Sequence, residues 1–358
     1  MMASVRIGVI GTSGWTETMF LASLASHSGA EVVALCGRDG ARASEVAGRH
    51  GIAGVYTDYR AMLAEAALDA VVVATPDDLH HEMTMAALDK GLHVLCEKPL
   101  ALTVGDARAM YEAAAARDIV HMVLFTWRWQ PHFRYLRQLL DEGYVGRLRY
   151  AEFRFIGGFG LLGGESWRTN SQRANGVVSD LGAHMFDFAR WYGGEVEALS
   201  AELAVLRQTT EQAPSNDDAT VNLIYESGAR GTVRVSTLAY QAGRWLELGV
   251  SLWGDAGRLE ARQYFAGQDA GVSIQGARVG EERFQELVVP AVLLNGLTNN
   301  EPMNPYLTQA AGPRLFVEGI LANRPVTPNF HDGYQVQRLI AAALAANATG
   351  RRVPLTDY

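Results

Sequence analysis

The first 125 residues alternate between short apolar runs and helical stretches, and this alternation restricts the possible folds more than any other feature of the chain. The runs are rich in valine, isoleucine and alanine and are nearly continuous in apolar residues, which is typical of strands buried on both faces. They lie at 5–11, 31–37, 69–75, 93–99 and 119–125, with a shorter one at 54–57. Helical patterns separate them at 40–50, 79–90 and 103–116, and Thr103 is suited to N-cap the last of these. Strands that alternate with helices in this way predict a parallel sheet with right-handed crossovers.

The pattern changes after about residue 126, where longer alternating segments replace the short apolar runs. Segment 245–253 alternates apolar with other residues, and 219–237 has the pattern of two strands joined at Ser227-Gly228, both typical of antiparallel strands with one covered face. Helices are expected at 131–142, 177–192, 306–323 and 333–348. Since 358 residues exceed what one core usually supports, we predict two domains. They are an α/β domain with a parallel sheet over 1–125 and an α+β domain with a mostly antiparallel, open-faced sheet over 126–358.

Composition and charge argue against several classes of protein. The net charge is −8, the sequence pI is about 5.6 and the basic residues form no run, which argues against nucleic acid or an anionic membrane surface as a partner. The two cysteines, Cys36 and Cys96, lie far apart in apolar runs, so we expect buried free thiols and a reducing, cytoplasmic setting. The first residues lack the basic and long apolar regions of a signal peptide, and no apolar stretch approaches the roughly 18 residues of a membrane span.

A glycine-containing turn follows the first apolar run. Backbone amides in such a turn can approach a pyrophosphate at the N-terminus of the next helix. The full G-x-G-x-x-G fingerprint needs glycines at 11, 13 and 16, but only Gly11 fits, because Ser13 and Thr16 stand at the other two places. An ordinary strand-to-helix turn is therefore the alternative. If the turn binds a nucleotide, we expect contacts from Gly11, Thr12, Ser13, Gly14 and Trp15.

The second apolar run ends without the acidic residue that binds an adenosine ribose 2′-hydroxyl in NAD-dependent proteins. Gly37 stands at the expected place, and Arg38 follows it. Because a guanidinium can bind a 2′-phosphate, this strand end favours NADP over NAD as the cofactor. The alternative is a solvated Arg38 beside an Asp39 that starts the next helix.

Two further strand ends carry polar residues. Thr75 and Pro76 follow the fourth strand, and Glu97-Lys98-Pro99 closes the fifth. Ligands of open parallel sheets bind at the carboxyl ends of the strands, so we expect Lys98 to project into the ligand cleft. A surface lysine is the alternative.

Asp180 and His184 lie four residues apart in the helix expected over 177–192, which places them on one face. A carboxylate beside an imidazole orients the ring and raises its pKa, which suits a general acid or base. A structural pair is the alternative, since Asp-x-x-x-His is common. A zinc ion at this pair would need another ligand that the sequence does not identify, so no metal is expected.

Several motifs together resemble the Gfo/Idh/MocA family of oxidoreductases. They are GVIGTSG, AVVVATPDDLHHE, GLHVLCEKPLALT, the Trp-Arg pair at 167–168, SDLGAH and FHDGYQVQRLIAAALAA. The resemblance runs from about residue 5 to the end, and the EKP and Asp-x-x-x-His elements are specific as a pair. It implies an N-terminal Rossmann domain and a C-terminal open antiparallel sheet. It also implies hydride transfer between NAD(P) and a carbinol carbon of a sugar, cyclitol or related polyol.

The resemblance implies roles for individual residues. Lys98 matches the lysine that contacts substrate and nicotinamide, His184 matches the catalytic histidine, and Asp180 matches its partner acid. The peptide between Lys98 and the following proline is often cis in such proteins. Further cofactor contacts are expected from Thr75, Pro76, His80, Glu97, Trp167, Arg168 and Tyr334, and a substrate contact from Arg128. The tryptophans on either side of Arg128 either stack on a sugar or pack beneath the site. The uncovered sheet face suggests a homodimer or homotetramer.

Two other functions fit the same motifs. Some relatives hold NAD tightly and cleave glycosidic bonds through transient oxidation, and a Rossmann protein can also sense NADP(H) without turnover. The presence of Lys98, Asp180 and His184 argues against a sensor, because a sensor does not require them. We expect the loops at 157–175 and 285–312 to select the polyol.

Overall fold

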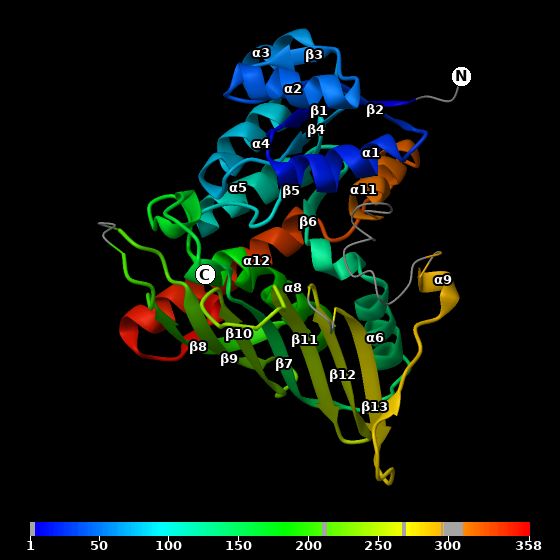
Figure 1. Cartoon of the computed structure of the whole chain (residues 1–358), viewed down its shortest axis with the longest axis vertical. Coiled ribbons are helices and arrows are strands. Elements are labelled where there is room, and N and C mark those ends of the chain that lie inside the picture. Colours follow the sequence, from blue (N-terminus) through cyan, green and yellow to red (C-terminus); the bar gives the residue numbers. More distant parts are fainter. Residues whose placement is uncertain (1–3, 210–212, 267–269, 295, 297–310) are drawn as a thin grey trace. The chain divides into compact units, whose positions relative to one another are not determined.

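The computed structural model describes residues 4–209, 213–266, 270–294, 296 and 311–358, and these divide into two compact units (Figure 1). Unit 1 comprises the described parts of Met1–Phe125 and Asn304–Gln337, and unit 2 comprises those of Thr126–Met303 and Arg338–Tyr358. The domain boundaries expected from the sequence place everything after residue 125 in the second domain. In the structure the chain returns to unit 1 for one segment before it ends in unit 2.

Unit 1 is built on a six-stranded parallel sheet with the strand order β3-β2-β1-β4-β5-β6. The strands are β1 (Val5–Ile10), β2 (Ala30–Cys36), β3 (Gly54–Tyr56), β4 (Ala70–Val73), β5 (His93–Glu97) and β6 (His121–Leu124). All six predicted runs are confirmed as strands, and every residue of β4 is buried, as a parallel sheet covered on both faces requires. The strand order reverses between β1 and β4. In open α/β sheets the carboxyl ends of the strands at such a switch point form the ligand crevice.

The helices of unit 1 follow the predicted pattern closely. They are η1 (Thr16–Leu21), α1 (Ala22–Ala25), α2 (Gly40–His50), α3 (Tyr59–Glu65), η2 (Asp77–Leu79), α4 (His80–Asp89), α5 (Val104–Ala115) and α11 (Ala311–Leu321). The Thr103 side chain accepts a hydrogen bond from Asp106 N at 3.1 Å, which confirms the predicted N-cap of α5. The helix predicted over 306–323 is confirmed as α11, while 306–310 lie outside the described residues. Cys36 and Cys96 are buried free thiols, and burial raises the pKa of Cys36 to about 11.

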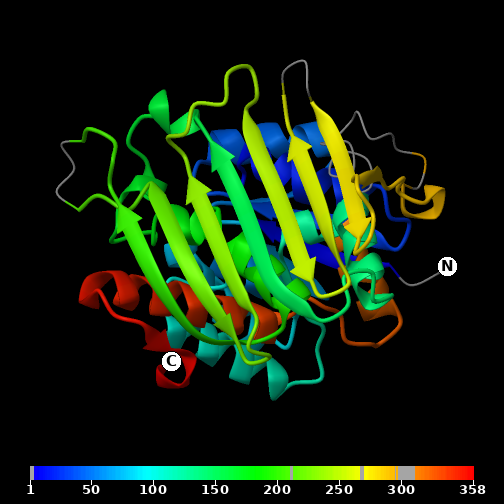
Figure 2. The same cartoon turned by 90° about the horizontal axis from the view of Figure 1, so that it is seen from below.

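Unit 2 contains a nine-stranded sheet with the order β14-β13-β12-β11-β7-β10-β9-β8-β15. The strands are β7 (Leu148–Gly157), β8 (Val196–Ala204), β9 (Asp218–Tyr225), β10 (Arg230–Ser236), β11 (Leu246–Gly254), β12 (Gly257–Tyr264), β13 (Gly271–Arg278), β14 (Gln285–Glu286) and β15 (Val353–Pro354). Among the described strands only the β7–β10 pair is parallel, so the prediction of a mostly antiparallel sheet is confirmed. Figure 2 shows this sheet from its open face.

Helices α6 (Pro131–Asp141) and α8 (Gly182–Gly193) pack on the other face of the unit 2 sheet. Pro131 occupies the first turn of α6, as predicted. The helix predicted over 177–192 is divided at Leu181 into α7 (Val177–Asp180) and α8. The remaining long helix, α12 (Phe330–Thr349), begins in unit 1 and ends in unit 2. None of the described helices is long and apolar enough to span a membrane.

The open face of the unit 2 sheet departs from simple alternation along β11. Leu246, Leu248, Val250 and Leu252 are buried on the covered side, as predicted. Glu247 on the opposite side is also only 8% exposed, because Arg154 and Arg262 of the neighbouring strands form ion pairs with it. A charged ladder therefore lies across the middle of the open face.

Candidate active site

The turn after β1 has a geometry that only glycine fits. Gly11 has a φ of +128°, and a Cβ atom on it would lie 2.3 Å from the carbonyl oxygen of Ala74. The turn therefore passes directly over the end of β4. A Cβ atom on Gly14, by contrast, would meet no atom within 4 Å, so a ligand has open access to the backbone there.

Two hydroxyl groups take the places of the missing fingerprint glycines. The Oγ atom of Ser13 lies 2.9 Å from Oγ1 of Thr16 and accepts a hydrogen bond from the Thr16 N–H at 3.1 Å. Ser13 thereby satisfies one of the free amides where the first helix begins. The departure at these two positions preserves the turn. An open glycine turn at a helix N-terminus is what a dinucleotide pyrophosphate requires, so these residues fit the expected cofactor.

The end of β2 explains why no acidic residue stands there. A Cβ atom on Gly37 would lie 2.5 Å from Cγ2 of Thr12, so the Thr12 side chain fills the space that an aspartate or glutamate would need. Asp39 accepts a hydrogen bond from Arg42 N and N-caps α2, as the alternative interpretation predicted. Arg38 is exposed and makes no hydrogen bond or ion pair with another described residue. Its guanidinium is therefore available to an anionic group.

Arg42 was missed by the sequence reasoning. Its Nε donates to the carbonyl oxygen of Thr12 at 3.3 Å and its Nη2 pairs with Glu17 at 2.7 Å, so it ties α2 to the glycine turn. An arginine in the first turn of a helix has no sequence signature that distinguishes this role from a solvated side chain.

The ring of His80, an expected cofactor contact, is enclosed by backbone groups of unit 1. Its side chain is fully buried, its Nδ1 lies 2.8 Å from the carbonyl oxygen of Pro99, and its Nε2 lies 2.9 Å from that of Thr75. Both ring nitrogens are thus engaged by the backbone. The side chain is 0% exposed, and its contact with a cofactor stays a prediction.

Glu97 connects the glycine turn to Lys98. Its Oε1 accepts a hydrogen bond from the Trp15 indole at 2.7 Å, and its Oε2 accepts one from the Lys98 N–H at 2.8 Å. Burial raises the pKa of the Glu97 carboxyl, although Lys98, Trp15 and His80 act in the opposite direction.

The Lys98–Pro99 peptide is cis, as the resemblance implied, and the Lys98 side chain is half-buried at the carboxyl end of β5. Thr75 and Pro76 are half-buried at the end of β4.

Unit 2 holds the predicted acid–base residues. His184 lies in α8, is 5% exposed, and packs against the rings of Trp127 and Phe155 at centroid distances of 5.9 and 6.0 Å. Asp180 ends α7, and its Oδ2 lies 3.6 Å from Nε of Arg168. The proposed pairing of Asp180 with His184 stays a prediction.

The Trp-Arg pair forms the short helix η5 (Trp167–Thr169). The Arg168 guanidinium lies over the Trp167 ring, 4.2 Å from its centroid, and the Arg168 side chain is 52% exposed. Arg168 and Asp180 both line a cavity of about 560 Å³ that lies wholly in unit 2. Its wall also includes Glu165, Thr209, Ser215 and Thr237.

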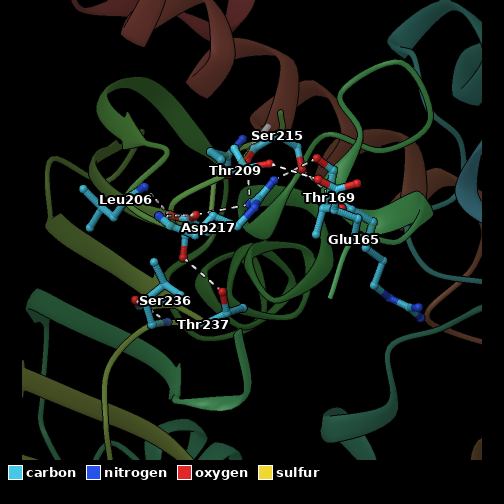
Figure 3. A network of polar contacts seen from close by, with 12 residues as sticks. Glu165, Thr169, Leu206, Thr209, Ser215, Asp217, Ser236 and Thr237 are labelled. Atoms are coloured by element: carbon cyan, nitrogen blue, oxygen red, sulfur yellow. Dashed lines mark hydrogen bonds and ion pairs between the residues drawn. The ribbon is translucent and has the colours of Figure 1, made fainter. Parts of the chain in front are cut away.

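An ion pair between the half-buried Arg207 and the buried Asp217 supports this wall (Figure 3). Arg207 Nη1 lies 3.2 Å from Oδ2 of Asp217, and Arg207 Nη2 donates to the carbonyl oxygen of Thr169 at 3.0 Å. Ser215 donates from its hydroxyl to the carbonyl oxygen of Arg168 at 2.8 Å. The segment that presents Trp167 and Arg168 is thus held by residues far along the chain. Sequence reasoning missed them, because nothing local indicates this pairing.

Arg128 and the neighbouring Trp127 both lie in unit 2. Arg128 forms a two-pronged ion pair with the buried Asp187, and its guanidinium lies over the Trp191 ring. Its contact with substrate stays a prediction. Trp127 is 4% exposed and packs beneath the site instead of offering its face to a sugar.

Tyr334 stacks on Tyr111 of α5 at a centroid distance of 6.1 Å against the unit 1 core, and its contact with cofactor stays a prediction. Among the residues that the structure describes, no three histidine, cysteine, aspartate or glutamate side chains group as metal ligands would.

Comparisons with known proteins agree with both units. Residues 5–125 match the model of the oxidoreductase family with an NAD-binding Rossmann fold, and residues 133–260 match the GFO/IDH/MocA C-terminal domain. A D-xylose 1-dehydrogenase (NADP(+)) of Haloferax volcanii is 32% identical over 65% of this chain and 69% of its own length. A D-apiose dehydrogenase of Paraburkholderia graminis is 34% identical over 60% of this chain, which spans 56% of that relative.

A solved levoglucosan dehydrogenase in complex with NADH and levoglucosan superimposes with a TM-score of 0.87 at 25% identity, over 98% of this chain and 99% of that one. The chain therefore belongs to the Gfo/Idh/MocA family of NAD(P)-dependent oxidoreductases.

Proposed function

We propose that the protein is a sugar dehydrogenase that prefers NADP and transfers hydride to or from a carbinol carbon of a sugar, cyclitol or related polyol. The observation that carries the proposal is the support of Lys98 at the end of β5, where the Glu97 carboxylate binds both the backbone of Lys98 and the turn that fits a dinucleotide. Relatives named as dehydrogenases of D-apiose, levoglucosan and D-xylose support a sugar as the substrate class.

The proposed mechanism assigns one task to each side chain. The nicotinamide, when bound, supplies or takes up the hydride. In the oxidation direction His184 accepts the hydroxyl proton as the C–H bond of the same carbon breaks. Asp180 orients the imidazole and stabilises its cationic form. The Lys98 ammonium donates a hydrogen bond to the reacting oxygen and stabilises its developing negative charge. The mechanism requires Lys98 and His184 to act on one carbinol.

The residues at the end of β2 favour NADP over NAD. Thr12 fills the space beside Gly37 that an acidic side chain would occupy, so no carboxylate there accepts from a ribose 2′-hydroxyl. The exposed Arg38 guanidinium follows directly and suits a 2′-phosphate. We therefore expect kcat/KM to be higher with NADP than with NAD, and Arg38→Ala to lower the NADP value while it leaves the NAD value nearly unchanged.

The unit 2 cavity is the proposed place for the part of the sugar away from the reacting carbon, because Asp180 lines it and His184 does not. Its wall offers hydroxyl groups, carboxylates and the Arg168 guanidinium, all of which pair well with the hydroxyls of a polyol. We further propose a homodimer or homotetramer that uses the open sheet face, on which Tyr150, Glu152 and Arg154 are only partly exposed. Light scattering of the purified protein measures that state directly.

The decisive experiment is a panel of aldoses, anhydrosugars, glucosides and inositols with NADP and NAD, followed at the nicotinamide absorbance band. We expect one or a few of these compounds to reduce the cofactor, with NADP preferred. Release of free sugar without net cofactor reduction would instead indicate a glycosidase that oxidises its substrate only transiently. Tight NADP(H) binding with no reaction in any arm would indicate a sensor and overturn the proposal.

A further inference from the structure

A buried histidine lies between the two strand ends that the proposed function depends on. His80 begins α4, and its ring stands between the carbonyl oxygens of Thr75, which follows β4, and Pro99, which follows β5. The two nitrogen-to-oxygen distances are 2.9 and 2.8 Å, and the side chain is 0% exposed. The ring is therefore held by two backbone acceptors with no access for solvent.

This arrangement decides how many protons the ring carries. A carbonyl oxygen can only accept a hydrogen bond, whereas a neutral imidazole has one N–H donor and one nitrogen with a bare lone pair. In either neutral tautomer one lone pair would point at a carbonyl oxygen at hydrogen-bond distance, and the two would repel. Only the imidazolium supplies the two donors that the two acceptors require. A buried cation bound by two acceptors is also better stabilised than one without partners.

From this geometry we propose that His80 is an imidazolium at neutral pH and acts as the positioning residue for Lys98. The first part concerns the charge of the ring alone, and the second rests on the proposed catalytic role of Lys98. The imidazolium ties the carbonyl of Pro99, one residue after Lys98, to the end of the neighbouring strand. Glu97 holds the Lys98 backbone from its other side. The backbone around Lys98 is thus fixed by a buried cation and a buried carboxylate.

The charged and titratable groups around His80 agree with this assignment. Cys96 and Glu97 of β5 both interact with it electrostatically, and Lys98 interacts with Glu97. On its own helix the neighbouring His81 turns to Asp106 of α5, at 3.8 Å. Burial by itself lowers the pKa of His80, but Cys96 and the two carbonyl oxygens outweigh it and raise that pKa to about 9.

The charge can be measured on the unmodified protein. With ¹⁵N-labelled histidine, long-range proton–nitrogen NMR distinguishes a protonated ring nitrogen from a bare one. We expect one of the nine histidines to carry two slowly exchanging ring N–H protons at pH 7.5, where an ordinary histidine with a pKa of about 6.5 is mostly neutral. If instead every slowly exchanging ring has one bare nitrogen at that pH, the imidazolium assignment is overturned.

The positioning role is tested by His80→Gln, with His81→Gln as the matched control on the same helix. Displacement of a catalytic group lowers the rate of the chemical step more than it weakens binding. We therefore expect His80→Gln to lower kcat at least about tenfold, with the KM for NADP changed less than about threefold. His81→Gln should behave as the wild type, because its side chain is 39% exposed. A wild-type kcat in His80→Gln would overturn the positioning role.

The pH profile of kcat distinguishes positioning by a charged His80 ring from a purely structural role of that ring. It is measured on the wild type, so it does not depend on whether His80→Gln folds. In the wild type, kcat should fall as the pH rises through about 9, where His80 loses its second proton. His80→Gln, where it folds, should lack this step, and a wild-type profile that is flat through that range would contradict the proposal. Failure of the proposed function gives a different result: the wild type would then reduce NADP with none of the compounds in the panel, while the NMR signal of the doubly protonated ring would be unaffected.

Discussion

The indole Nε1 of Trp15 donates a hydrogen bond to Oε1 of Glu97 at 2.7 Å, although 82 positions separate the two residues in sequence. The bond joins the glycine turn to the strand end that carries Lys98. The substitution Trp15→Phe keeps an aromatic ring but removes the N–H donor. The buried Oε1 atom of Glu97 then lacks this hydrogen bond. We expect the free energy of unfolding to fall by about 1–3 kcal/mol, measured by urea denaturation.

The control for this variant is Trp245→Phe. Trp245 is 51% exposed, so its replacement should change the free energy of unfolding by less than about 0.5 kcal/mol. Equal stabilities of the two variants would mean that the bond between Trp15 and Glu97 contributes nothing measurable.

Gly11 and Gly14 should respond differently to the same substitution. Gly11→Ala forces a Cβ atom to within 2.3 Å of the Ala74 carbonyl oxygen at a φ of +128°, so we expect it to lower the free energy of unfolding by at least about 2 kcal/mol. Gly14→Ala meets no atom within 4 Å and should leave the unfolding midpoint nearly unchanged. Because a ligand is expected against Gly14, that variant should instead weaken NADP binding, measured by titration calorimetry. A stable Gly11→Ala would refute the steric argument.

The elements that the sequence predicted well are those with a local cause. The buried strands of unit 1, the cap at Thr103 and the first turn at Pro131 all depend on residues within a few positions. The partners of His80 and Arg128 were not predicted. Those of His80 lie 5 and 19 positions away, and Asp187, the partner of Arg128, lies 59 positions away. Side-chain pairing over such separations is decided by the tertiary fold, and a single sequence carries no record of it.

The ion pair between Arg207 and the buried Asp217 should matter for stability. Their side chains are 15% and 4% exposed, and Arg207→Met would leave the Asp217 carboxylate buried without its cation. Breaking such a pair costs about 3–5 kcal/mol. Arg168→Met is the matched control, since its ion pair with Asp180 is 3.6 Å long and the Arg168 side chain is 52% exposed, so a loss of about 1 kcal/mol or less is expected. Equal losses in chemical denaturation would contradict this account.

Acid should destabilise the protein through histidines that are buried as the neutral form. Burial lowers the pKa of His132 to about 3, and the same cause lowers that of His121 to about 4. The unfolded chain therefore binds protons more readily than the folded chain at these two positions. Their contribution to stability is fully present above the unfolded pKa of about 6.5 and is lost as the pH falls toward the folded values.

For His132 alone the expected loss between pH 6.5 and pH 5 is about 2 kcal/mol, which urea denaturation at several pH values would detect. His132→Phe keeps a ring in the same place but removes the titrating group, so its stability should fall less steeply over this interval. An identical slope in the wild type and in His132→Phe would show that His132 is not the cause.

Lys98→Ala and His184→Asn should each lower turnover by at least about 100-fold, because each removes a group that acts on the reacting oxygen or its proton. Lys90→Ala and His331→Ala are the matched controls, since both residues are exposed, and their turnover should equal that of the wild type. Bound NADP(H), measured by fluorescence, establishes that each variant is folded and loaded before rates are compared. If either active-site variant keeps near-normal turnover with NADP(H) bound, that residue has no part in the chemical step.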